Sequence, residues 1–367
     1  MRSAAGCAGL GLLLLLVAGT FDAEPLYVTG SALVLLGLGA AVWIGLGARG
    51  ARVQRAISRR SVVEEEPLQV EIDAFAGRLP LPPGWIDEPL LPEPVRFKPG
   101  GRRARVHVEV TFARRGRRML EPPALVLRDP FGLAERTVRG AHGDELLVLP
   151  RTSPVVATGG GGDAMAAHAR AALIAAAETE IDGLRPARDG SPASRIHWPA
   201  LARGAGLMER KLISEADSRP LVVMDPRSPT SEESLDAAVR AAASLTVHFA
   251  RRQGCALLLP GDRRASVIEP DLLGWPQAHV RLALVGDHTG PSLVAAQNRR
   301  GLVMLVAARP MDRPPRGLGR TPGGCLLILP AELPGRRAVI EVSGCFGYVA
   351  TRTGAAAALA AASSGAG

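Results

Sequence analysis

Two charge-free apolar stretches stand near the start of the chain, Ala4–Thr20 and Leu26–Gly47. The second is long enough to cross a bilayer as a helix, and the first nearly is. Because only the acidic turn Phe21–Pro25 separates them, the pattern predicts an antiparallel helical hairpin. A cleavable signal peptide is the competing interpretation, since Arg2 and the run Leu12–Leu16 resemble its first two regions. We favour the hairpin, because no small-residue cleavage site precedes the turn.

Arginines crowd the exit of the second apolar stretch, whereas the short loop carries only Asp22 and Glu24. These arginines are Arg49, Arg52, Arg55, Arg59 and Arg60. Because basic residues near membrane spans stay on the cytoplasmic side, we expect a two-span protein of the plasma membrane. Both termini and the whole body should lie in the cytoplasm, where thiols stay reduced.

From residue 61 to about residue 150 the apolar pattern changes to period two. Leu68–Ile72 and Ala104–Phe112 alternate between apolar and polar residues, which predicts strands with one face in a core. Shorter runs at Ala124–Leu127 and Glu145–Leu149 add further strands. Five or so short strands with many turns predict a small β-sandwich, immunoglobulin-like in style.

Two turns of this region carry distinctive residues. Arg114–Arg118 holds four arginines around Gly116, and we interpret it as a hairpin turn with the arginines at its tip. The arginines Arg114, Arg115, Arg117 and Arg118 are therefore a candidate contact for anionic lipid or another polyanion. Asp129–Gly132 is a tight turn that should tuck Phe131 back onto the sheet.

Strands and helices alternate in the last part of the chain. The run Arg219–Asp225 has the character of a buried parallel strand and ends in an acid. A helix over Ser231–Arg252 and a strand over Cys255–Leu259 follow. Later apolar runs stand at Leu302–Ala307, Cys325–Leu329 and Ala338–Val342. This alternation predicts a mainly parallel α/β sheet, whose ligands bind beyond the carboxyl ends of strands, so Asp225 marks the expected functional edge.

Composition and motifs narrow the function classes. The net charge is +9, and the positive charge is almost all arginine, since Lys98 and Lys211 are the only lysines. This bias is typical of a GC-rich genome, so the basic composition is weak evidence for nucleic-acid binding. The four cysteines form no C-x-x-C pair, which argues against a disulfide framework or a zinc site. Gly159–Gly162 is followed by no Lys-Ser/Thr, so it reads as a linker before an Ala-rich helix. We expect no cofactor, no nucleic-acid partner and no enzymatic activity.

The stretch LRPARDGSPASRIHW, residues 184–198, is the most distinctive segment of the chain. Together with Asp129–Leu133 and Pro150-Arg151, it resembles the bacterial membrane proteins grouped as domain of unknown function fifty-eight, whose C-terminal domain is von Willebrand factor A-like (vWA-like). The residues of this signature that match the family are Arg185, Arg188, Arg195, His197, Trp198, Arg203 and Glu209. Ala187, Ser191 and Pro199 stand where the family commonly has Tyr, Asp and Lys.

The resemblance and the patterns together predict a membrane-anchored α+β and α/β protein in four segments. These are the transmembrane hairpin with its basic exit (1–60), the β-sandwich-like domain (61–158), the linker, helix and signature (159–218), and the vWA-like α/β domain with a mainly parallel sheet (219–367). In the signature, Arg185, Arg195 and Arg203 can each grip a carboxylate. They either brace the segment onto Glu209, Glu215 or Asp217, or form a docking surface for an acidic partner. His197, beside Trp198, is expected to be packed rather than to act as a metal ligand.

The vWA resemblance also implies a divalent metal held after the first strand through Asp-x-Ser-x-Ser. This chain has Asp225, Arg227 and Pro229 at those three positions, with Ser228 between the last two. Mg²⁺ requires hard oxygen ligands, whereas arginine brings a positive charge and proline offers no side-chain oxygen. We therefore expect a degenerate loop that holds no metal, with the Arg227 guanidinium as a candidate partner of Asp225.

The family resemblance implies frequent association with MoxR-type AAA+ ATPases and with transglutaminase-like membrane proteins, in assembly or cell-envelope processes. We therefore hypothesise a membrane-anchored cytoplasmic adaptor or scaffold that works with a protein partner. An anionic-lipid- or polyanion-binding module, and an enzyme of unrecognised type, are the alternatives.

Overall fold

The computed structural model of the chain divides into two compact units, Met1–Val148 and Leu149–Gly367. The structure describes residues 2–158, 184–186, 198–204, 206–210, 219–297, 299, 301–318, 321 and 324–350. Arg188, Arg195 and His197 of the signature lie outside the described residues, as do Glu215, Asp217 and the expected Ala-rich helix.

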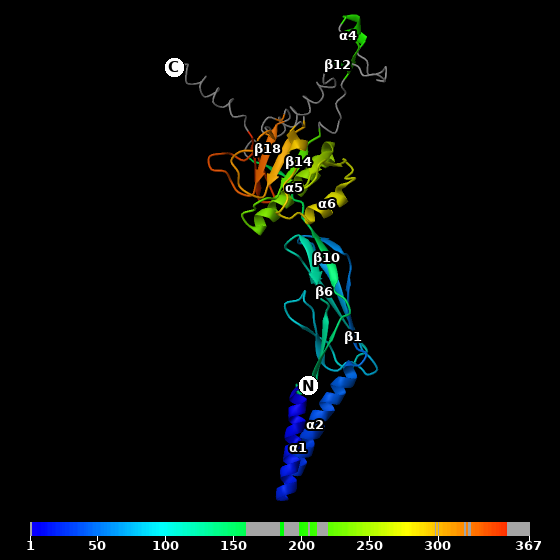
Figure 1. The fold of residues 1–367 in the computed structure, drawn as a ribbon. Helices are drawn as coiled ribbons and strands as arrows, with labels where there is room; N and C mark the ends of the chain where they lie inside the picture. Colours follow the sequence, from blue (N-terminus) through cyan, green and yellow to red (C-terminus); the bar gives the residue numbers. More distant parts are fainter. Residues whose placement is uncertain are drawn as a thin grey trace. The chain divides into compact units, whose positions relative to one another are not determined.

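The first unit begins with two apolar helices, as the sequence predicts. They are α1 (Arg2–Phe21) and α2 (Glu24–Ala48), which run side by side (Figure 1). Glycines let their backbones approach closely: a Cβ on Gly11 would lie 2.6 Å from the carbonyl oxygen of Gly30, and one on Gly37 would lie 2.7 Å from that of Ala4. Small residues at the contact are typical of helices that pack in lipid.

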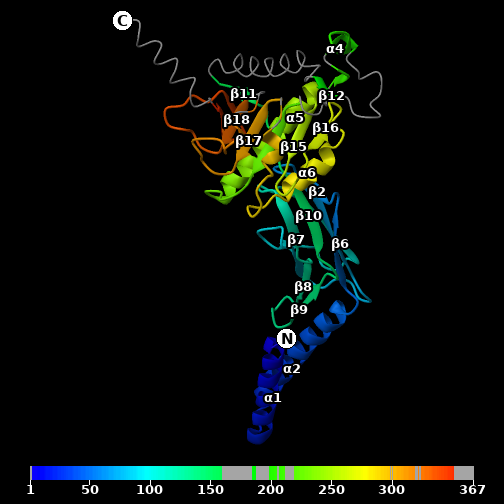
Figure 2. The same ribbon diagram turned by 45° about the horizontal axis from the view of Figure 1, so that its top comes forward.

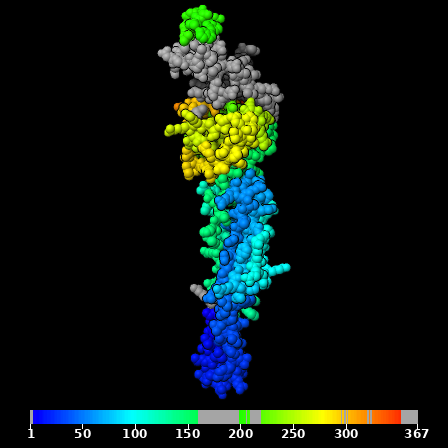
Figure 3. All heavy atoms as spheres, turned by 90° about the vertical axis from the view of Figure 1, so that its right-hand side faces the viewer, coloured from blue at the N-terminus to red at the C-terminus, as the bar shows by residue number. Residues whose placement is uncertain are grey.

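Large apolar side chains cover the outside of this helix pair. Leu13, Leu16 and Leu35 are exposed. Only 22% of the most apolar part of α1 and 28% of the most apolar part of α2 is buried inside the protein. Both helices are long and apolar enough to cross a membrane. In Figure 3 the dark-blue atoms of the two helices lie directly against each other.

Ten strands follow in the first unit, which is about twice the number that the sequence pattern predicts. They form three sheets with the orders β1-β3-β6, β2-β10-β7 and β5-β4-β8-β9. The strands are β1 (Arg52–Ile57), β2 (Ser61–Val63), β3 (Leu68–Phe75), β4 (Gly84–Asp87), β5 (Val95–Arg96), β6 (Arg103–Val110), β7 (Gly116–Leu120), β8 (Ala124–Arg128), β9 (Glu135–Arg139) and β10 (Asp144–Leu149).

The period-two pattern of this region produces one shared apolar core. In β3 every second residue is buried, and β3 pairs antiparallel with β6 from Leu68 opposite Val110 to Phe75 opposite Arg103. Leu68, Ile72 and Ile86 are fully buried in the same cluster as Ile44 and Ala48 of α2. Burying a side chain of this size stabilises the fold by about 1.5–3 kcal/mol, so the core also fixes the end of α2 on the strands.

Two turn predictions for this region are wrong. Arg114–Arg118 is not a hairpin tip, because β6 and β7 belong to different sheets and the residues between them cross from one sheet to the other. Gly116 does have the expected positive φ of 117°, but Arg117 and Arg118 lie within β7, opposite Leu147 and Leu146 of β10. Phe131 does not fold back onto the sheet; it is 70% exposed.

The second unit contains a mixed sheet of eight strands in the order β11-β19-β20-β18-β17-β14-β15-β16 (Figure 2). These strands are β11 (Val156–Ala157), β14 (Leu221–Asp225), β15 (Cys255–Leu258), β16 (Ser266–Ile268), β17 (Val303–Ala307), β18 (Cys325–Leu329), β19 (Ile340–Val342) and β20 (Cys345–Val349). The other described elements are β12 (Leu184–Pro186), β13 (Met208–Arg210), α4 (Trp198–Ala202), α5 (Glu232–Gln253), α6 (Trp275–Ala283) and α7 (Val294–Gln297).

Only the centre of this sheet is parallel, so the mainly parallel sheet that we expected needs correction. β15, β14, β17 and β18 run in the same direction. The flanking pairs β15–β16, β18–β20, β19–β20 and β11–β19 are antiparallel. For β19 and β20 the cause is local, because the two-residue turn Ser343-Gly344 between them can join only antiparallel strands.

The helix α5 forms where the sequence predicts it and covers one face of the sheet. Ser231 caps its first turn in a reciprocal capping box with Ser234, and Gly254 ends it with a φ of +78°. Its buried residues, among them Leu245 and Phe249, pack against Val222 of β14 in the larger core cluster. A second cluster on the opposite strand faces includes Val223, Leu305 and Tyr348.

A buried charge cluster links the three sheets of the first unit. Arg55 of β1 donates from Nη1 to Oε1 of Glu88 at 2.6 Å and from Nε to Oδ2 of Asp144 at 2.8 Å. Its Nη2 donates to the Leu120 carbonyl oxygen at 3.2 Å. The side chains of Arg55 and Glu88 are 0% and 1% exposed. Burial raises the pKa of Glu88 above its ordinary value, although the Arg55 guanidinium acts to lower it.

We expect Arg55→Met to lower the free energy of unfolding of the first unit by about 3–5 kcal/mol, because it leaves the Glu88 carboxylate buried without its cation. Hydrogen exchange of the β1, β4 and β10 amides, measured on the full chain in detergent, checks this. Arg59→Met is the matched control, since Arg59 pairs with Glu66 at 3.3 Å with 71% of its side chain exposed. Equal losses in both variants would contradict the prediction.

The pH dependence of that loss has a defined sign. Because the folded-state pKa of Glu88 lies above its unfolded value, the folded protein binds this proton more tightly than the unfolded chain. Removing Arg55 removes an interaction that lowers this pKa, so the difference becomes larger. The deficit of Arg55→Met relative to the parent should therefore shrink as the pH falls from neutral toward the pKa of Glu88.

Candidate functional site

The strand β14 stands where the connections of the sheet change direction. From β14 the chain passes through α5 to β15 on one side, while β17 pairs with β14 on the other side. All residues of β14 are buried, and its last residue is Asp225. In open α/β sheets ligands bind beyond the carboxyl ends of strands at such a switch point. The end of β14 is therefore the first candidate site.

Asp225 forms a bidentate ion pair with Arg227. The Arg227 Nε lies 2.8 Å from Oδ1 of Asp225, and its Nη2 lies 2.9 Å from Oδ2. The Asp225 side chain is 1% exposed, whereas that of Arg227 is 41% exposed. Hydrogen bonding to Asp225 raises the pKa of Arg227. The structure thus shows the pair that the sequence suggested, with the acid underneath and the cation at the surface.

Two neighbouring groups complete this arrangement. A Cβ on Gly290 would lie 2.6 Å from Arg227 Nε, so the guanidinium packs directly on the backbone of that glycine. Arg309, just after β17, brings its Nη2 to 3.9 Å from Oδ2 of Asp225 and is 34% exposed. The adjacent strands also meet here, where the Ala308 N–H donates to the Asp225 carbonyl oxygen at 2.9 Å. Ser228 is exposed and has a φ of +50°.

These residues do not fit the divalent metal that the vWA resemblance implies. Both carboxylate oxygens of Asp225 already accept hydrogen bonds from Arg227, and a second guanidinium stands close by. Mg²⁺ needs several hard oxygen ligands around it. Among the residues that the structure describes, no group of three or more His, Cys, Asp or Glu is placed to hold a metal ion.

A shallow pocket of about 350 Å³ lies beside this edge, at the end of β15. It is lined by Leu259, Pro260, Arg281, Leu284, Val285, Gly286, His288 and Thr289. Arg281 Nη2 pairs with Oδ1 of Asp262 at 2.6 Å. The Gly261 N–H donates to the Gly290 carbonyl oxygen at 3.3 Å, so the segment that supports Arg227 also forms one wall beside this pocket. Arg281 is thus engaged in an ion pair, and we identify no catalytic constellation among the described residues of this pocket.

The signature segment is described only in part. The strands β12 and β13 pair so that the backbone of Arg185 lies opposite that of Glu209. Trp198 begins α4 and is 55% exposed. Arg203 is exposed at the end of the same helix. The described part of the signature therefore has both a paired section and an exposed section.

The arginines of Arg114–Arg118 are not a free basic tip. Arg114 and Arg115 are half-buried, and the Arg115 backbone N–H donates to Oε1 of Glu64 at 2.9 Å. Arg117 pairs with Glu145 at 3.0 Å on the neighbouring strand. These contacts tie the segment into the fold, while the Arg117 and Arg118 side chains stay exposed on β7, so the polyanion alternative remains a hypothesis.

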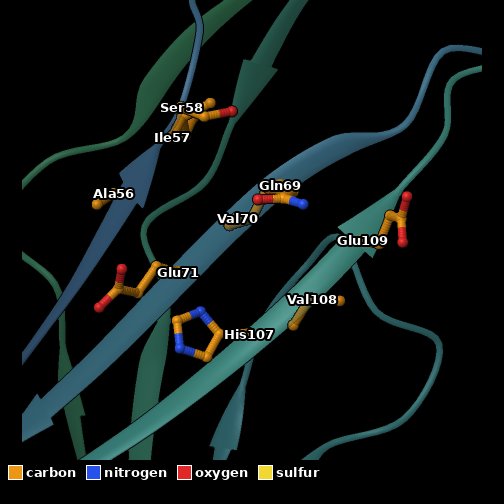
Figure 4. A pocket seen from close by; sticks show the side chains of 9 residues that line it. All are labelled: Ala56, Ile57, Ser58, Gln69, Val70, Glu71, His107, Val108 and Glu109. Atoms are coloured by element: carbon orange, nitrogen blue, oxygen red, sulfur yellow. The ribbon is translucent and has the colours of Figure 1, made fainter.

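A wider pocket of about 530 Å³ lies on the first unit, over β1, β3 and β6. Figure 4 shows Glu71 and His107 side by side on neighbouring strands, with Glu109 and Gln69 further along. Glu71 already pairs with Arg105 at 2.6 Å. Alternation along an antiparallel strand places such polar residues on the solvent-facing side of a half-buried sheet, which accounts for this surface.

Arg309 and Gly290 are parts of the site that the sequence did not reveal. A signal for Arg309 existed, because it follows an apolar strand run, as Arg227 does, and the carboxyl ends of adjacent parallel strands meet at one edge. Gly290 lies in a loop, and we find no sequence pattern that places it under Arg227.

Comparison with known proteins adds no assignment: no protein-family model matches the chain, and the search of curated proteins gives no match.

We expect millimolar Mg²⁺ or Mn²⁺ to leave the thermal unfolding temperature unchanged, because only ligands that bind the native state raise it. The double variant Arg227→Ser with Pro229→Ser supplies oxygens in place of the guanidinium and should show a metal-dependent rise. Asp225→Ala in that background is the control and should abolish the rise. A metal-dependent rise in the parent that Asp225→Ala removes would overturn the prediction.

Proposed function

We propose that this protein is a membrane-anchored cytoplasmic adaptor or scaffold, held by a transmembrane hairpin of α1 and α2. The observation that carries this proposal is the helix pair, whose small residues face each other while its leucines face outward. A soluble protein rarely exposes so continuous an apolar surface. The acidic turn on one side and the arginines after α2 on the other favour a cytoplasmic body.

The edge of the second unit supports a role in binding rather than in metal chemistry. β14 ends at a switch point, as in a vWA-like domain with its site after the first strand, and we propose that this unit is a degenerate domain of that kind. The Arg227 and Arg309 side chains are the partly exposed groups there, above the buried Asp225. Two guanidinium groups at an edge suit the carboxylates of an acidic partner segment.

The partner class comes from the sequence resemblance. We propose a MoxR-type AAA+ ATPase, with a transglutaminase-like membrane protein as a further associate, in assembly or cell-envelope processes. The exposed Trp198 and Arg203 of the signature are a second candidate contact for the same partner, since aromatic and arginine side chains are enriched at protein interfaces.

The membrane topology predicts a labelling pattern. In intact cells a membrane-impermeant thiol reagent should react with a cysteine placed at Asp22, in the turn between the helices. It should not react with one placed at Lys98, which is exposed in the cytoplasmic body. Permeabilised cells provide the control, because both cysteines should then react. The reverse pattern in intact cells would refute the proposed orientation.

The adaptor role predicts a charge-dependent complex. The full chain in detergent should bind the MoxR-type ATPase of the same organism, and Arg309→Ser should weaken binding about tenfold, the value of one charge-assisted hydrogen bond. Arg313→Ser is the matched control, because Arg313 is an exposed arginine four residues further along the chain and is not one of the two arginines that pair with Asp225. Absence of binding by the parent would refute this partner, and equal losses in both variants would refute the edge as its contact.

A further inference from the structure

Outside the helices, the described residues of the first unit expose three large apolar side chains, Leu79, Met119 and Phe131. Isolated exposed apolar residues are ordinary on protein surfaces. Leu79 and Phe131, however, belong to two turns that both lie near the C-terminal end of α2. Because the two residues share this position, we look for one cause of their exposure.

The segment 77–83 lies against the last turn of α2. A Cβ on Gly47 would lie 2.4 Å from Cγ of Pro82, and one on Gly77 would lie 2.0 Å from the carbonyl oxygen of Arg49. These close approaches fix the segment beside the point where α2 ends. Leu79 projects from it and is 39% exposed.

The turn between β8 and β9 is rigid but leaves its aromatic ring uncovered. The buried Asp129 carboxylate accepts hydrogen bonds from the backbone N–H groups of Phe131, at 2.9 Å, and Ala134. The Gly132 N–H donates to the Asp129 carbonyl oxygen at 3.0 Å. A turn held at this many points presents Phe131 outward at little cost in conformational entropy.

This turn lies at the level of the helix ends. Leu133 and Val138 pack against the cluster that contains Ala4 of α1 and Ile44 of α2. Figures 1 and 2 both show the end of the β8–β9 hairpin beside the N-terminal end of α1. Arg128 lies against Gly132, the residue after Phe131, with its Nη2 2.6 Å from where a Cβ on Gly132 would be. Its Nε pairs with Oε2 of Glu135 at 4.0 Å, and its side chain stays 50% exposed.

We propose that the β8–β9 turn inserts Phe131 into the boundary between headgroups and acyl chains of the cytoplasmic leaflet, with Leu79 as a second contact. Apolar side chains with basic neighbours are typical of segments that lie in the membrane interface, and Arg128 is placed to meet anionic headgroups. The inference deepens the proposed function, because it rests on α1 and α2 crossing the membrane. It would fix the first unit on the bilayer surface at a point other than α2 itself.

Site-directed fluorescence on the full chain in liposomes of phosphatidylcholine and phosphatidylglycerol tests this. Cys7→Ala removes the one cysteine outside the core; burial raises the pKa of Cys255, Cys325 and Cys345 to about 12, so those thiols stay unreactive. An environment-sensitive fluorophore is then attached to Phe131→Cys, Met119→Cys or Leu35→Cys, one at a time. The sites at 131 and 119 are matched, being 70% and 73% exposed.

The three sites separate the possible outcomes. We expect blue-shifted emission and loss of fluorescence with lipids spin-labelled near the headgroup at site 131, and neither effect at site 119. Site 35, in the middle of α2, should be quenched by lipids labelled deep in the acyl chain. Quenching at 35 with site 131 behaving like 119 would overturn the interfacial contact alone. Absence of quenching at 35 would refute the membrane span, and this inference with it. Blue-shifted emission at 131 without lipid quenching would indicate a protein contact and would also overturn it.

Discussion

Complete burial of the central strands determines where polar side chains that could bind a ligand can lie in the second unit. Every residue of β14, β15, β17 and β18 is buried, so these strands carry apolar side chains along almost their whole length. Polar groups are therefore confined to the strand ends. Asp225 stands at such a strand end but is itself buried, and a buried carboxylate requires a hydrogen-bonding or charged partner. Arg227 supplies it from two residues away, and Gly290 provides the space for its guanidinium.

In the first unit the buried carboxylate is paired with an arginine that is itself buried. Arg55 of β1 lies in the interior, where its donors reach Glu88 next to β4, and Asp144 and the Leu120 carbonyl oxygen of the β2-β10-β7 sheet. Such a cluster contributes to the specificity of the arrangement more than to its stability, because desolvation offsets much of the attraction. Arg227, by contrast, keeps 41% of its side chain exposed. The Arg55 cluster therefore holds sheets together, whereas the Arg227 pair leaves a cation accessible at an edge.

The sequence predicts the elements whose signals are local and fails where the outcome depends on distant parts of the chain. The helix α5 has its capping serine and glycine directly before and after it in the sequence, and the two apolar helices can be predicted from their length and composition alone. The arginine-rich segment 114–118 is predicted wrongly as a hairpin turn, because a local pattern does not tell whether two successive strands pair with each other or enter different sheets. Phe131 is similar: the Asp129 turn fixes its backbone, but only the surrounding packing decides whether a surface covers the ring.

The Asp225 edge shows how few substitutions change the character of a site. With oxygen ligands around it, the acid at the end of β14 would present a negative surface to a cation. With Arg227 in place, both carboxylate oxygens face a guanidinium, and the groups that reach solvent are those of Arg227 and Arg309. Compared with an acid surrounded by oxygen ligands, this strand end presents charge of the opposite sign. That charge is the reason why the proposed partner of this edge is an acidic protein segment and not a metal ion.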